Sequence, residues 1–484
     1  MRLQDLLYKV NISKVVGNTN IDINDVQFDS RKTQDKGLFV AIKGTISDGH
    51  EYINNTIRDG AVAIILERLP LDFKDNITYI QVDSSYSALA IIAANFYNNP
   101  SEKIKLVGIT GTNGKTTIVN LLHQLFTLLK KKVGMISTIE NKILDKTVPS
   151  THTTPDPLQI NYFLNAMVEK SCEYCFIEVS SHALCQGRIN GLSFSGGVFT
   201  NISHEHLDYH QTFSEYRDVK KSFFDSLSQE AFALTNKDDK NGNKMLEGTK
   251  AKKLTYSLRS FAKYRCKILE NQFEGMLLQI NKIDFWVKLI GKFNAYNMLA
   301  VYAVAKQFAL QDHELLTALS MLNAAEGRFQ SVKNEDNIKG IVDYAHTDDA
   351  LVNVLSTINT IRTNTESLIT IFGCGGDRDK NKRTLMTQAA CNLSTQVIIT
   401  SDNPRTENPQ DIIEDMIAGL TPMQMKKVLV ITDRREAIMT AGRLAIKNDI
   451  ILLAGKGHEK YQEIRGEKIP FDDMKELKKS LNII

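Results

Sequence analysis

The sequence predicts an α/β protein of three domains. These are a small mixed α/β N-terminal domain (residues 1–100), a central domain with a mainly parallel sheet (101–328) and a Rossmann-like C-terminal domain (329–484). Apolar runs of strand length alternate with helix-like segments from 102 onward, which is the pattern of a parallel sheet with crossover helices. In addition, 484 residues exceed the size of one ordinary hydrophobic core, so several domains are expected.

The composition is that of a globular protein, with 42% hydrophobic and 24% charged residues. A net charge of +3 is small for this length and gives no reason to expect nucleic-acid or membrane-surface binding. No uncharged apolar run approaches ~20 residues, and the first residues lack the apolar core of a secretion signal. The sequence therefore predicts a cytoplasmic protein without a membrane span. Cys172 and Cys175 form a lone C-x-x-C, which we interpret as reduced thiols rather than zinc ligands.

The first hundred residues mix strands with a helix-like segment from 86 to 97. The strand-like runs are residues 37–42, 61–66 and 77–82. Polar turns at Asp29-Ser-Arg31 and Asp48-Gly-His50 have positions where ligands are often held, although solvated turns are equally expected there. Asn98-Asn-Pro-Ser101 is typical of a linker.

The central domain begins with a strand, a glycine turn and a helix in succession. Apolar residues 104–109 lead into Gly111-Thr-Asn-Gly-Lys-Thr-Thr117, and a helix-like segment continues to Leu129. Glycines let backbone N–H groups point at phosphate oxygens, and the helix N-terminus adds its positive end. Lys115 can reach the β- and γ-phosphates and Thr116 can offer a hydroxyl to Mg²⁺. The sequence therefore predicts a P-loop ATPase-like domain, although Ile109 stands where the general motif has its first glycine.

Polar residues also follow three later strands of this domain. They are Glu178-Val-Ser-Ser-His182, residues 201–210 and residues 236–239. Because the carboxyl ends of parallel strands share one edge of a sheet, Glu178 and His206 are expected near Thr116. A carboxylate and an imidazole beside a phosphate loop suit Mg²⁺ or its water molecules, although either residue taken singly is more often structural.

Lys220 lies on the apolar side of a predicted helix. The segment 213–227 carries an apolar stripe that includes Tyr216 and Leu227, and Lys220 falls on it while Lys221 points elsewhere. Removal from water favours the neutral amine, which can add CO₂ to form a carbamate able to hold a metal or orient a phosphate. Most lysines at such positions instead extend their ammonium group to water, and this alternative stays open.

Residues 251–284 are rich in strands and carry no recognisable chemistry. The segment Gly291-Lys-Phe-Asn-Ala-Tyr-Asn297 then leads into an apolar helix through Phe308. Asn294 is expected to cap this helix, and Asn297 is a candidate for a hydrogen bond to a nucleotide base.

Five strand-like runs of the C-terminal domain are each followed by a loop dense in glycine or charge. The loops are residues 343–346, 373–378, 401–405, 432–434 and 455–459. Loops at one edge of a parallel sheet should converge on one crevice. Arg378 and Arg405 suit carboxylates, whereas Asp402, Asn403 and Glu459 suit an ammonium group, so an amino acid fits this crevice. A dinucleotide site is the competing interpretation, but Gly373-Cys-Gly-Gly lacks the G-x-G-x-x-G register.

With these motifs assembled, the sequence resembles the Mur ligase family over nearly its whole length, and within it the members that add the third peptide residue. The matching motifs occur in the family's order: Gly111 to Thr117, Glu178 to His182, His206-Leu-Asp208, Gly291 to Asn297, Gly327-Arg328 and Asp343-Tyr-Ala-His346. An ordered set of this kind is far more specific than any one motif.

The resemblance implies a role for each matching position. Those expected to bind ATP are Gly111, Thr112, Asn113, Gly114, Lys115, Thr116, Asn297, Arg328, Asp343 and His346. Those expected to hold Mg²⁺ are Thr116, Glu178, His206 and a carbamylated Lys220, and Lys115, Glu178, His206 and Lys220 would be catalytic. The UDP-sugar peptide would be bound by Ser30, Thr153, Thr154, Ser180, Gln186 and Arg188. The amino acid would be bound by Arg378, Asp402, Asn403, Pro404, Arg405, Gly455 and Glu459.

The implied activity is ATP-dependent addition of meso-2,6-diaminopimelate to UDP-N-acetylmuramoyl-L-alanyl-D-glutamate through an acyl phosphate, in peptidoglycan precursor synthesis. The N-terminal domain would bind the UDP-sugar peptide, the central domain would bind ATP, and the C-terminal domain would bind the amino acid. The loop Asp402-Asn-Pro-Arg405 is similar to that of the diaminopimelate-adding members. The partners would be these three small molecules, with no nucleic acid, and the chain would be a monomer.

Four alternatives remain: a lysine-adding ligase, a folylpolyglutamate-type ligase, a P-loop ATPase switch and a nucleotide-binding scaffold. Arg405 disfavours the first and the motifs from Ser180 to Arg188 the second. The switch does not explain five convergent loops. The residues that argue against the scaffold are the intact Lys115, Glu178, His206 and Lys220.

Overall fold

The computed structural model describes residues 1–44, 47–150, 152–203, 212–363 and 365–483. The described chain divides into two compact units, one formed by residues 1–202 with 212–255 and the other by residue 203 with residues 256–483. The domain boundaries at 100/101 and 328/329 therefore stay a prediction. Within the described residues, no helix combines the length and apolar character that crossing a bilayer requires.

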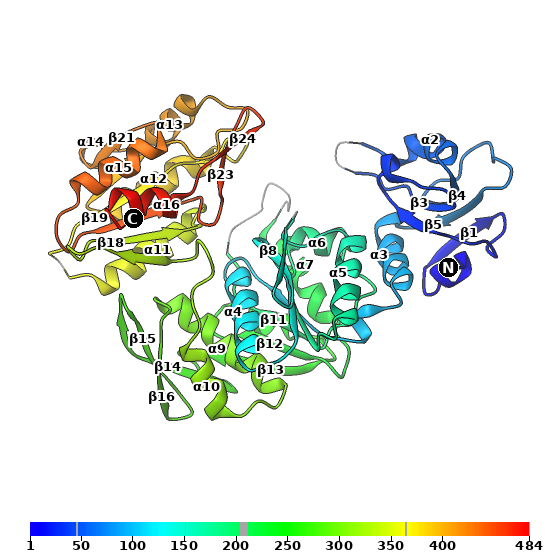
Figure 1. Cartoon of the computed structure of the whole chain (residues 1–484), viewed down its shortest axis with the longest axis horizontal. Helices are drawn as coiled ribbons and strands as arrows, with labels where there is room; N and C mark the ends of the chain where they lie inside the picture. Colours follow the sequence, from blue (N-terminus) through cyan, green and yellow to red (C-terminus); the bar gives the residue numbers. More distant parts are fainter. Residues whose placement is uncertain (45–46, 151, 204–211, 364, 484) are drawn as a thin grey trace. The chain divides into compact units, whose positions relative to one another are not determined.

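The N-terminal part of the first unit is a five-stranded sheet in the order β1-β5-β4-β3-β2 (Figure 1). Only β1 is antiparallel to its neighbour; the other pairs are parallel. Its strands are β1 (Ile12–Val16), β2 (Asp25–Gln27), β3 (Gly37–Val40), β4 (Ala61–Leu66) and β5 (Thr78–Val82). Its helices are α1 (Leu3–Leu6), η1 (Ser30–Lys32), η2 (Gly49–Tyr52), α2 (Ile53–Arg58), α3 (Ser85–Phe96) and η3 (Pro100–Glu102). The mixed α/β character predicted from the sequence is confirmed.

The rest of the first unit is built on a mainly parallel sheet whose order is β13-β12-β11-β6-β10-β7-β8-β9. The pairs β12/β11, β11/β6, β6/β10 and β10/β7 are parallel, and β8 and β9 add an antiparallel extension. The strands are β6 (Lys105–Thr110), β7 (Val133–Ile136), β8 (Glu140–Ile143), β9 (Lys146–Pro149), β10 (Tyr174–Glu178), β11 (Gly196–Phe199), β12 (Phe232–Asn236) and β13 (Lys252–Ser257). The helices are α4 (Lys115–Leu128), α5 (Pro157–Glu169), α6 (Ser181–Cys185), α7 (Phe213–Asp225) and α8 (Gly242–Met245).

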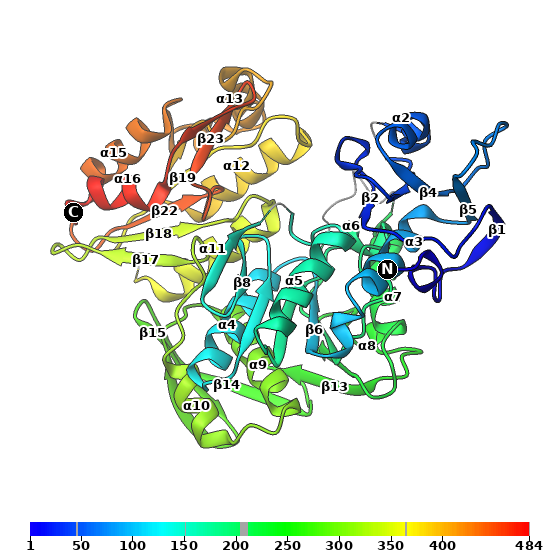
Figure 2. The same cartoon turned by 45° about the vertical axis from the view of Figure 1, so that its right-hand side comes forward.

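Helix α4, which is labelled in Figure 2, packs on strands β6, β7 and β10. The parallel registers place Glu178 opposite Ile109 and Phe199 opposite Thr110. The carboxyl ends of β6, β10 and β11 therefore meet at one edge of the sheet, as the sequence predicted.

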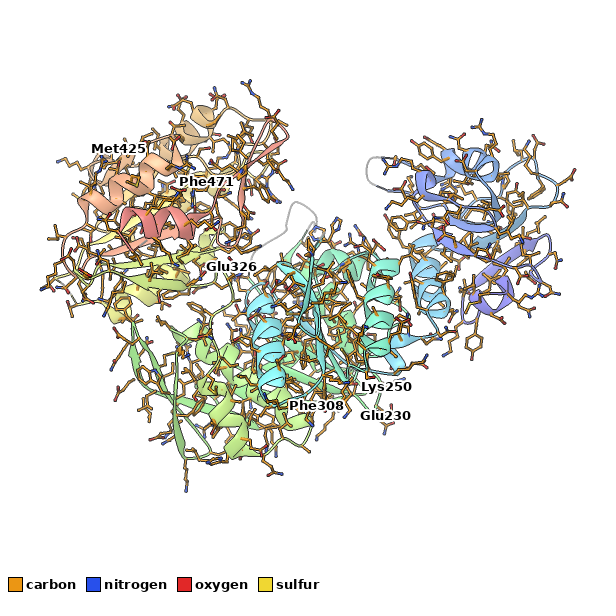
Figure 3. The ribbon with its side chains drawn as sticks, in the orientation of Figure 1. Glu230, Lys250, Phe308, Glu326, Met425 and Phe471 are labelled. Carbon is orange, nitrogen blue, oxygen red and sulfur yellow. The ribbon has the colours of Figure 1, made fainter. Side chains whose placement is uncertain are left out.

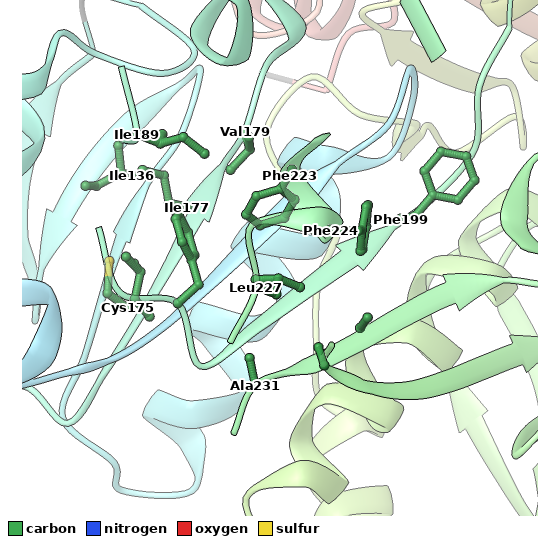
Figure 4. Packing of buried hydrophobic residues seen from close by; sticks show 14 of the residues in the cluster. Ile136, Cys175, Ile177, Val179, Ile189, Phe199, Phe223, Phe224, Leu227 and Ala231 are labelled. Carbon is green, nitrogen blue, oxygen red and sulfur yellow. The ribbon is translucent and has the colours of Figure 1, made fainter. Parts of the chain in front are cut away.

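Two glycines allow helix α7 to pack closely on this sheet. A Cβ on Gly108 would lie 2.6 Å from the Phe223 ring, and one on Gly197 would lie 2.8 Å from the same ring. Phe223, Phe224 and Leu227 are buried in a cluster that includes residues of β10 and β11 (Figure 4). Each fully buried side chain of this size contributes about 1.5–3 kcal/mol to stability. The same contacts fix the face of α7 that carries Lys220.

The second unit begins with three antiparallel strands, β14 (Tyr264–Gln272), β15 (Gly275–Ile280) and β16 (Ile283–Val287). Helices α9 (Lys292–Gln307) and α10 (Asp312–Ser320) follow. The prediction that Asn294 caps α9 was wrong. Gly291 is the N-cap, while Asn294 lies inside the helix and donates its side-chain amide to Ile290 O at 2.9 Å.

The C-terminal sheet has six strands in the order β17-β18-β22-β19-β20-β21. All neighbours are parallel except β17 and β18. The strands are β17 (Gln330–Lys333), β18 (Lys339–Asp343), β19 (Leu368–Phe372), β20 (Gln396–Ile399), β21 (Val428–Val430) and β22 (Ile450–Ala454). The helices are α11 (Asp348–Ile361), α12 (Asn381–Leu393), α13 (Pro409–Ile417), α14 (Pro422–Met425), α15 (Arg434–Leu444) and α16 (Asp473–Ser480).

The five strand-like runs predicted for this domain are all present. Two elements were not predicted: the antiparallel edge strand β17, and a hairpin of β23 (Tyr461–Ile464) and β24 (Glu467–Pro470). With the N-terminal and central sheets, this largely parallel sheet confirms the α/β class.

Candidate functional site

The phosphate loop lies between β6 and α4, and close contacts require its glycines. Gly111 has φ +147°, and a Cβ there would lie 1.9 Å from Thr200 Oγ1. Gly114 has φ +90° and is the N-cap of α4, a conformation that glycine adopts without steric cost. Lys115 is the first residue of the helix and donates to the carbonyl oxygens of Gly111 at 2.8 Å and Thr112 at 2.7 Å. The strand, turn and helix predicted for a phosphate site are therefore present.

Residues that follow β11 hold this loop in place. Thr200 Oγ1 donates to the carbonyl oxygen of Asn113 at 2.6 Å. The Asn201 side chain accepts a hydrogen bond from Asn113 N at 2.9 Å and donates to its carbonyl oxygen at 3.1 Å. The backbone of Asn113 is thus fixed on both sides by the neighbouring parallel strand.

Glu178 ends β10 and is completely buried, with 0% of its surface exposed. Its carboxylate accepts hydrogen bonds from Thr116 Oγ1 at 3.1 Å, Thr138 N at 2.8 Å and Thr138 Oγ1 at 3.1 Å. A carboxylate removed from water needs such donors. The expectation that Glu178 lies beside Thr116 is confirmed.

Lys220 lies on the buried face of α7, with 1% of its surface exposed. Its Nζ donates to Gly111 O at 3.2 Å and lies 4.5 Å from the centre of the Tyr216 ring. The alternative that this lysine extends to water is therefore excluded. Lys221, one residue on, forms an ion pair of 2.6 Å with Asp225. The burial predicted from the apolar stripe is confirmed.

A second polar cluster adjoins Glu178 on the other side. Thr154, which is 1% exposed, donates from Oγ1 to Glu178 O at 2.8 Å, and the same oxygen accepts a hydrogen bond from Ser180 N at 3.1 Å and lies 3.2 Å from Ser180 Oγ. Ser180 in turn caps α6 by accepting a hydrogen bond from Ala183 N at 3.2 Å. Thr154 and Ser180 are therefore fixed by the end of β10 and the start of α6.

Arg188 and Thr153 extend this cluster. The Arg188 guanidinium donates to Thr154 O at 2.6 Å and to Gln186 Oε1 at 2.8 Å. Thr153 Oγ1 lies within hydrogen-bond distance of Thr138 Oγ1, at 3.2 Å. Five of the six residues predicted to bind the UDP-sugar peptide thus share one network. Ser30, the sixth, is the first residue of the short helix η1 in the N-terminal part of the unit. Asp29 caps this helix by accepting a hydrogen bond from Arg31 N at 3.2 Å.

His206 falls among residues 204–211, which lie outside the described residues, as do the rest of the predicted His206-Leu-Asp208 motif and His204 and His210. Ile202, just before this segment, donates its backbone N–H to Asp239 Oδ2 at 3.0 Å. All six cysteines are described, and each is a free thiol. Cys172 and Cys175 are buried, and burial raises the pKa of both.

In the second unit, Arg328, Asp343 and His346 lie around Tyr344. The Arg328 guanidinium is 4.5 Å from the centre of the Tyr344 ring, and the His346 ring is also 4.5 Å from it. Asp343 accepts a hydrogen bond from Phe329 N at 2.7 Å. Burial raises the pKa of Asp343 to about 6, against the opposing effect of Arg328.

The loop before β17 packs against the loop after β22 in this region. A Cβ on Gly327 would lie 2.1 Å from His458 N, so only glycine fits. Glu326, which precedes it and is labelled in Figure 3, forms an ion pair with Lys460. Asn297, the remaining predicted nucleotide residue, is buried in α9 and donates to Asn294 Oδ1 at 3.0 Å. Within the described residues, no hydrogen bond connects Asn297 to Arg328.

A pocket opens at the carboxyl ends of β18, β19, β20 and β22. It is lined by residues from four of the five predicted loops, including Arg378, Asp402, Asn403, Arg405, Gly455 and Glu459. Every residue predicted to bind the amino acid except Pro404 is in this lining, and Pro404 lies in the same loop, where its carbonyl oxygen would be 2.0 Å from a Cβ on Gly376. Asp402 and Asn403 are buried, whereas Arg378 is exposed.

The expectation that the loop 432–434 also reaches the pocket was wrong. Asp433 caps α15 by accepting a hydrogen bond from Glu436 N at 3.0 Å. Arg434 turns into the core, where it pairs with Asp473 at 2.6 Å and both side chains are 0% exposed. The charge of this loop therefore supports the fold, because a buried guanidinium requires a carboxylate partner.

Arg405 is held by the hairpin that the sequence did not predict. Its backbone is left-handed, with φ +51°. Arg405 N donates to Glu463 O at 3.0 Å, and Arg465 N donates to Arg405 O at 2.7 Å. Its side chain donates to Gly376 O at 2.6 Å and lies 3.6 Å from the Glu463 carboxylate. This clamp maintains a conformation that costs a non-glycine residue about 1–3 kcal/mol.

Three contributors to these sites were missed from the sequence: Thr138, Lys456 and the β23–β24 hairpin. Thr138 follows β7, which pairs in parallel with β10, so recognition of β7 as a strand would have placed it at the same edge as Glu178. Lys456 stands between two residues that were predicted, and nothing in the sequence gives the direction of its side chain. The hairpin residues Tyr461–Ile464 and Glu467–Pro470 carry no motif.

Comparison with known proteins places this arrangement in context. Three family models match successive parts of the chain. They are described as the catalytic domain of the Mur ligase family (residues 22–97), the Mur ligase middle domain (109–305) and the Mur ligase glutamate ligase domain (327–457).

Proteins of several bacteria are similar to this chain over its full length. One from Parabacteroides distasonis is 51% identical over 478 residues, which cover 99% of this chain and 98% of that protein. One from Bacteroides fragilis is 49% identical over 483 residues, which cover both chains completely. Both are named UDP-N-acetylmuramoyl-L-alanyl-D-glutamate--2,6-diaminopimelate ligase.

Solved structures agree with this similarity. A structure with the same ligase name has a TM-score of 0.71 at 31% identity and covers 100% of this chain and 99% of its own. The MurF ligase of Thermotoga maritima, solved in complex with ADP, has a TM-score of 0.62 at 18% identity over 95% of this chain and 97% of its own. At that identity the second structure supports the fold alone.

Proposed function

Because the chain belongs to the Mur ligase family, we propose that it adds meso-2,6-diaminopimelate to UDP-N-acetylmuramoyl-L-alanyl-D-glutamate at the expense of ATP. Two relatives that are about half identical over their full length carry this activity in their names. The observation that carries the proposal is the C-terminal pocket, whose lining includes Arg378 and Arg405 together with the carboxylates of Asp402 and Glu459 and the amide of Asn403. A ligand with a carboxylate and an ammonium group at the same end can pair its carboxylate with the arginines and its ammonium group with the carboxylates and the amide oxygen.

ATP is expected to bind at the loop from Gly111 to Thr116, with Lys115 near the β- and γ-phosphates. The backbone N–H groups at the start of α4 and the helix dipole favour phosphate oxygens there. Asn297, Arg328, Asp343 and His346 are proposed to bind other parts of the nucleotide. The stacking of Arg328 on Tyr344 supports a rigid cationic group for that role.

The residues beside the loop fit Mg²⁺. The Thr116 hydroxyl and the buried Glu178 carboxylate offer hard oxygen donors 3.1 Å apart. Among the described residues no cluster of three His, Cys, Asp or Glu side chains forms a metal cage. Mg²⁺ characteristically takes one or two carboxylates together with substrate phosphates and water. We propose that Thr116, Glu178 and His206 hold Mg²⁺, which would neutralise charge on the transferring phosphoryl group.

Lys220 is proposed to carry a carbamate. Its neutral amine would attack CO₂, forming an N–C bond and releasing one proton to solvent, and the product is an anion. The burial of Lys220 supports this proposal, because removal from water is the general condition that favours the neutral amine needed to add CO₂. A carbamate there would be a further oxygen ligand for Mg²⁺ or would orient a phosphate.

The UDP-sugar peptide is proposed to bind at Ser30 and at the cluster of Thr153, Thr154, Ser180, Gln186 and Arg188. Arg188 offers a guanidinium that its contacts with Gln186 and Thr154 hold in one direction. Thr154 bonds directly to the backbone of Glu178, so the acceptor cluster and the phosphoryl site share one framework. This connection favours alignment of the acceptor carboxylate with the γ-phosphate.

The reaction is proposed to proceed in two steps. The γ-carboxylate of the D-glutamyl residue attacks the γ-phosphorus of ATP, the bond to the β-phosphate oxygen breaks, and an acyl phosphate and ADP form. The neutral amine of diaminopimelate then attacks the acyl carbon, and phosphate leaves as the amide forms and a proton is released. Phosphorylation is necessary because a carboxylate itself has no adequate leaving group. Lys115 would stabilise charge on the transferring group.

Phosphate release tests this function. The protein is incubated with ATP and UDP-N-acetylmuramoyl-L-alanyl-D-glutamate, and meso-diaminopimelate or L-lysine is supplied in separate reactions. Release confined to diaminopimelate supports the proposal. Release with lysine would move the protein to the lysine-adding ligases, and steady release without any amino acid would favour an ATPase switch.

We further propose that the protein acts as a monomer in the cytoplasm. ATP and nucleotide-linked sugars are cytoplasmic metabolites, which supports that location. Light scattering of the purified protein at working concentration would measure its oligomeric state directly.

A further inference from the structure

Lys456 lies beneath the amino-acid pocket and has no role in the function proposed above. It follows β22, and 0% of its side chain is exposed. Its Nζ is 3.4 Å from Asp402 Oδ1, 3.0 Å from Asn403 Oδ1 and 3.1 Å from Glu459 Oε2. All three partners line the pocket, whereas Lys456 itself does not. One buried ammonium group therefore contacts three residues of the candidate amino-acid site.

These contacts determine how Asn403 is oriented. An ammonium group only donates hydrogen bonds, so Asn403 must turn its side-chain oxygen toward Lys456. The same oxygen accepts a hydrogen bond from Glu463 N at 2.9 Å, and the Asn403 amide then donates to Glu459 Oε2 at 2.8 Å. Lys456 and strand β23 together allow one orientation of the amide.

The same ammonium group offsets charge in the pocket. Asp402 and Glu459 each contribute a negative charge, and in a partly buried site their mutual repulsion is only weakly screened. The three N–H donors of Lys456 match three acceptors, so its own burial leaves no donor without a partner. Without Lys456, one amide and two carboxylates would lose a shared donor.

We propose that Lys456 is the positioning residue of the amino-acid pocket, and that its charge contributes to the choice of amino acid. This inference rests on the proposed function. Diaminopimelate brings an ammonium and a carboxylate to the pocket, so its distal end has no net charge, whereas the distal end of lysine is a cation. Removal of the Lys456 charge leaves a more negative pocket, which disfavours diaminopimelate relative to lysine.

The test compares Lys456→Met with Lys427→Met. Methionine has a similar unbranched stem but no charge or donor. Lys427 lies in the same unit and donates to Cys391 O at 2.8 Å and Ser394 O at 3.2 Å, without lining the pocket. For each protein, KM for diaminopimelate, KM for ATP, kcat and kcat/KM with L-lysine are measured, together with Tm.

Lys456→Met is expected to raise KM for diaminopimelate about tenfold or more, since hydrogen bonds to charged groups are lost, while KM for ATP stays within about twofold. The ratio of kcat/KM for diaminopimelate to that for lysine should fall. Lys427→Met should change neither KM for diaminopimelate nor the ratio of the two kcat/KM values, although it is expected to lower Tm. Lys456→Gln keeps two N–H donors without the charge. Its KM for diaminopimelate should therefore lie between those of the wild type and Lys456→Met, whereas its ratio of kcat/KM for diaminopimelate to that for lysine should stay as low as in Lys456→Met.

An unchanged KM for diaminopimelate in Lys456→Met, or an equal rise in both KM values, would overturn the inference. So would failure of both Lys456 variants to fold, because a purely structural residue would behave in that way. The wild-type protein separates this result from the function itself. If it released no phosphate with either amino acid, the proposed function and this inference would both fall, whereas normal wild-type turnover confines any failure to Lys456.

Discussion

Substitution of Thr138 by valine examines a contact that no motif indicated. Thr138 Oγ1 donates to Glu178 Oε2 at 3.1 Å, and Thr138 N donates to Oε1 at 2.8 Å. Valine keeps the branched shape and the backbone donor but lacks the hydroxyl. The perturbation therefore removes one hydrogen bond from a buried carboxylate while the packing of the side chain is retained.

The size of the effect follows from the burial of Glu178. Its surface is 0% exposed, so water does not replace the lost donor. Hydrogen bonds to charged groups contribute about 1.5–3 kcal/mol, which corresponds to roughly 10- to 150-fold in rate if the full interaction is needed in the transition state. We expect kcat of Thr138→Val to fall by this factor and the Mg²⁺ concentration for half-maximal activity to rise.

The assay is phosphate release at saturating substrates over a range of Mg²⁺ concentrations, with Tm measured alongside. Thr138→Ser restores the hydroxyl and should recover most of the activity. Thr127→Val is a matched control, because among the described residues the Thr127 hydroxyl bonds only to a carbonyl one turn back in α4, His123 O at 2.8 Å. If Thr138→Val kept kcat within about twofold of wild type, Glu178 would not depend on Thr138 for its catalytic position.

Three further predictions concern the other sites. Lys220→Ala should abolish ligation and recover part of it when a short carboxylate is added; full activity without the additive would contradict the carbamate. Arg405→Ala should raise KM for diaminopimelate far more than KM for ATP, and equal changes would remove Arg405 from the amino-acid site. The folded-state pKa of Asp343, about 6, lies above its ordinary value of 3.8, so the unfolded chain loses this proton first and stability should fall as pH rises from about 4 to about 6. Asp343→Asn should lack that part of the pH dependence in urea unfolding, and identical profiles would refute the assignment.

The parts of the fold that were predicted are those in which local pattern and tertiary structure agree. Apolar runs such as Ala61–Leu66 and Leu368–Phe372 became strands with those same bounds, because parallel strands covered on both faces require continuous apolar sequence. The stripe on α7 predicted the burial of Lys220 for a similar reason. The helix can place Phe223 on the sheet only by turning Lys220 toward Gly111.

The errors arose where one residue type serves two purposes. Arg434 in a charged loop after a strand has the sequence appearance of a ligand-binding residue, but its guanidinium pairs with Asp473, which lies 39 positions later in the chain. Asn294 near a helix start is typical of a cap, yet Gly291 takes that position. Sequence pattern identifies the edge of a sheet where side chains gather, whereas the direction of each side chain depends on partners that are distant in the sequence.

The two sites share one physical arrangement, and it explains which residues the motifs leave out. Glu178 in one unit, and Asp402 with Glu459 in the other, are carboxylates expected to receive cations, the first Mg²⁺ and the others an ammonium group. Such carboxylates must be held in place by hydrogen-bond donors and must also keep lone pairs available for the cation. Each therefore needs donors that leave some of its lone pairs unoccupied. Thr138 supplies them to Glu178 and Lys456 supplies them to the pair. Substitution of Thr138 should therefore weaken Mg²⁺ binding in part, whereas removal of the Glu178 carboxylate itself should abolish it.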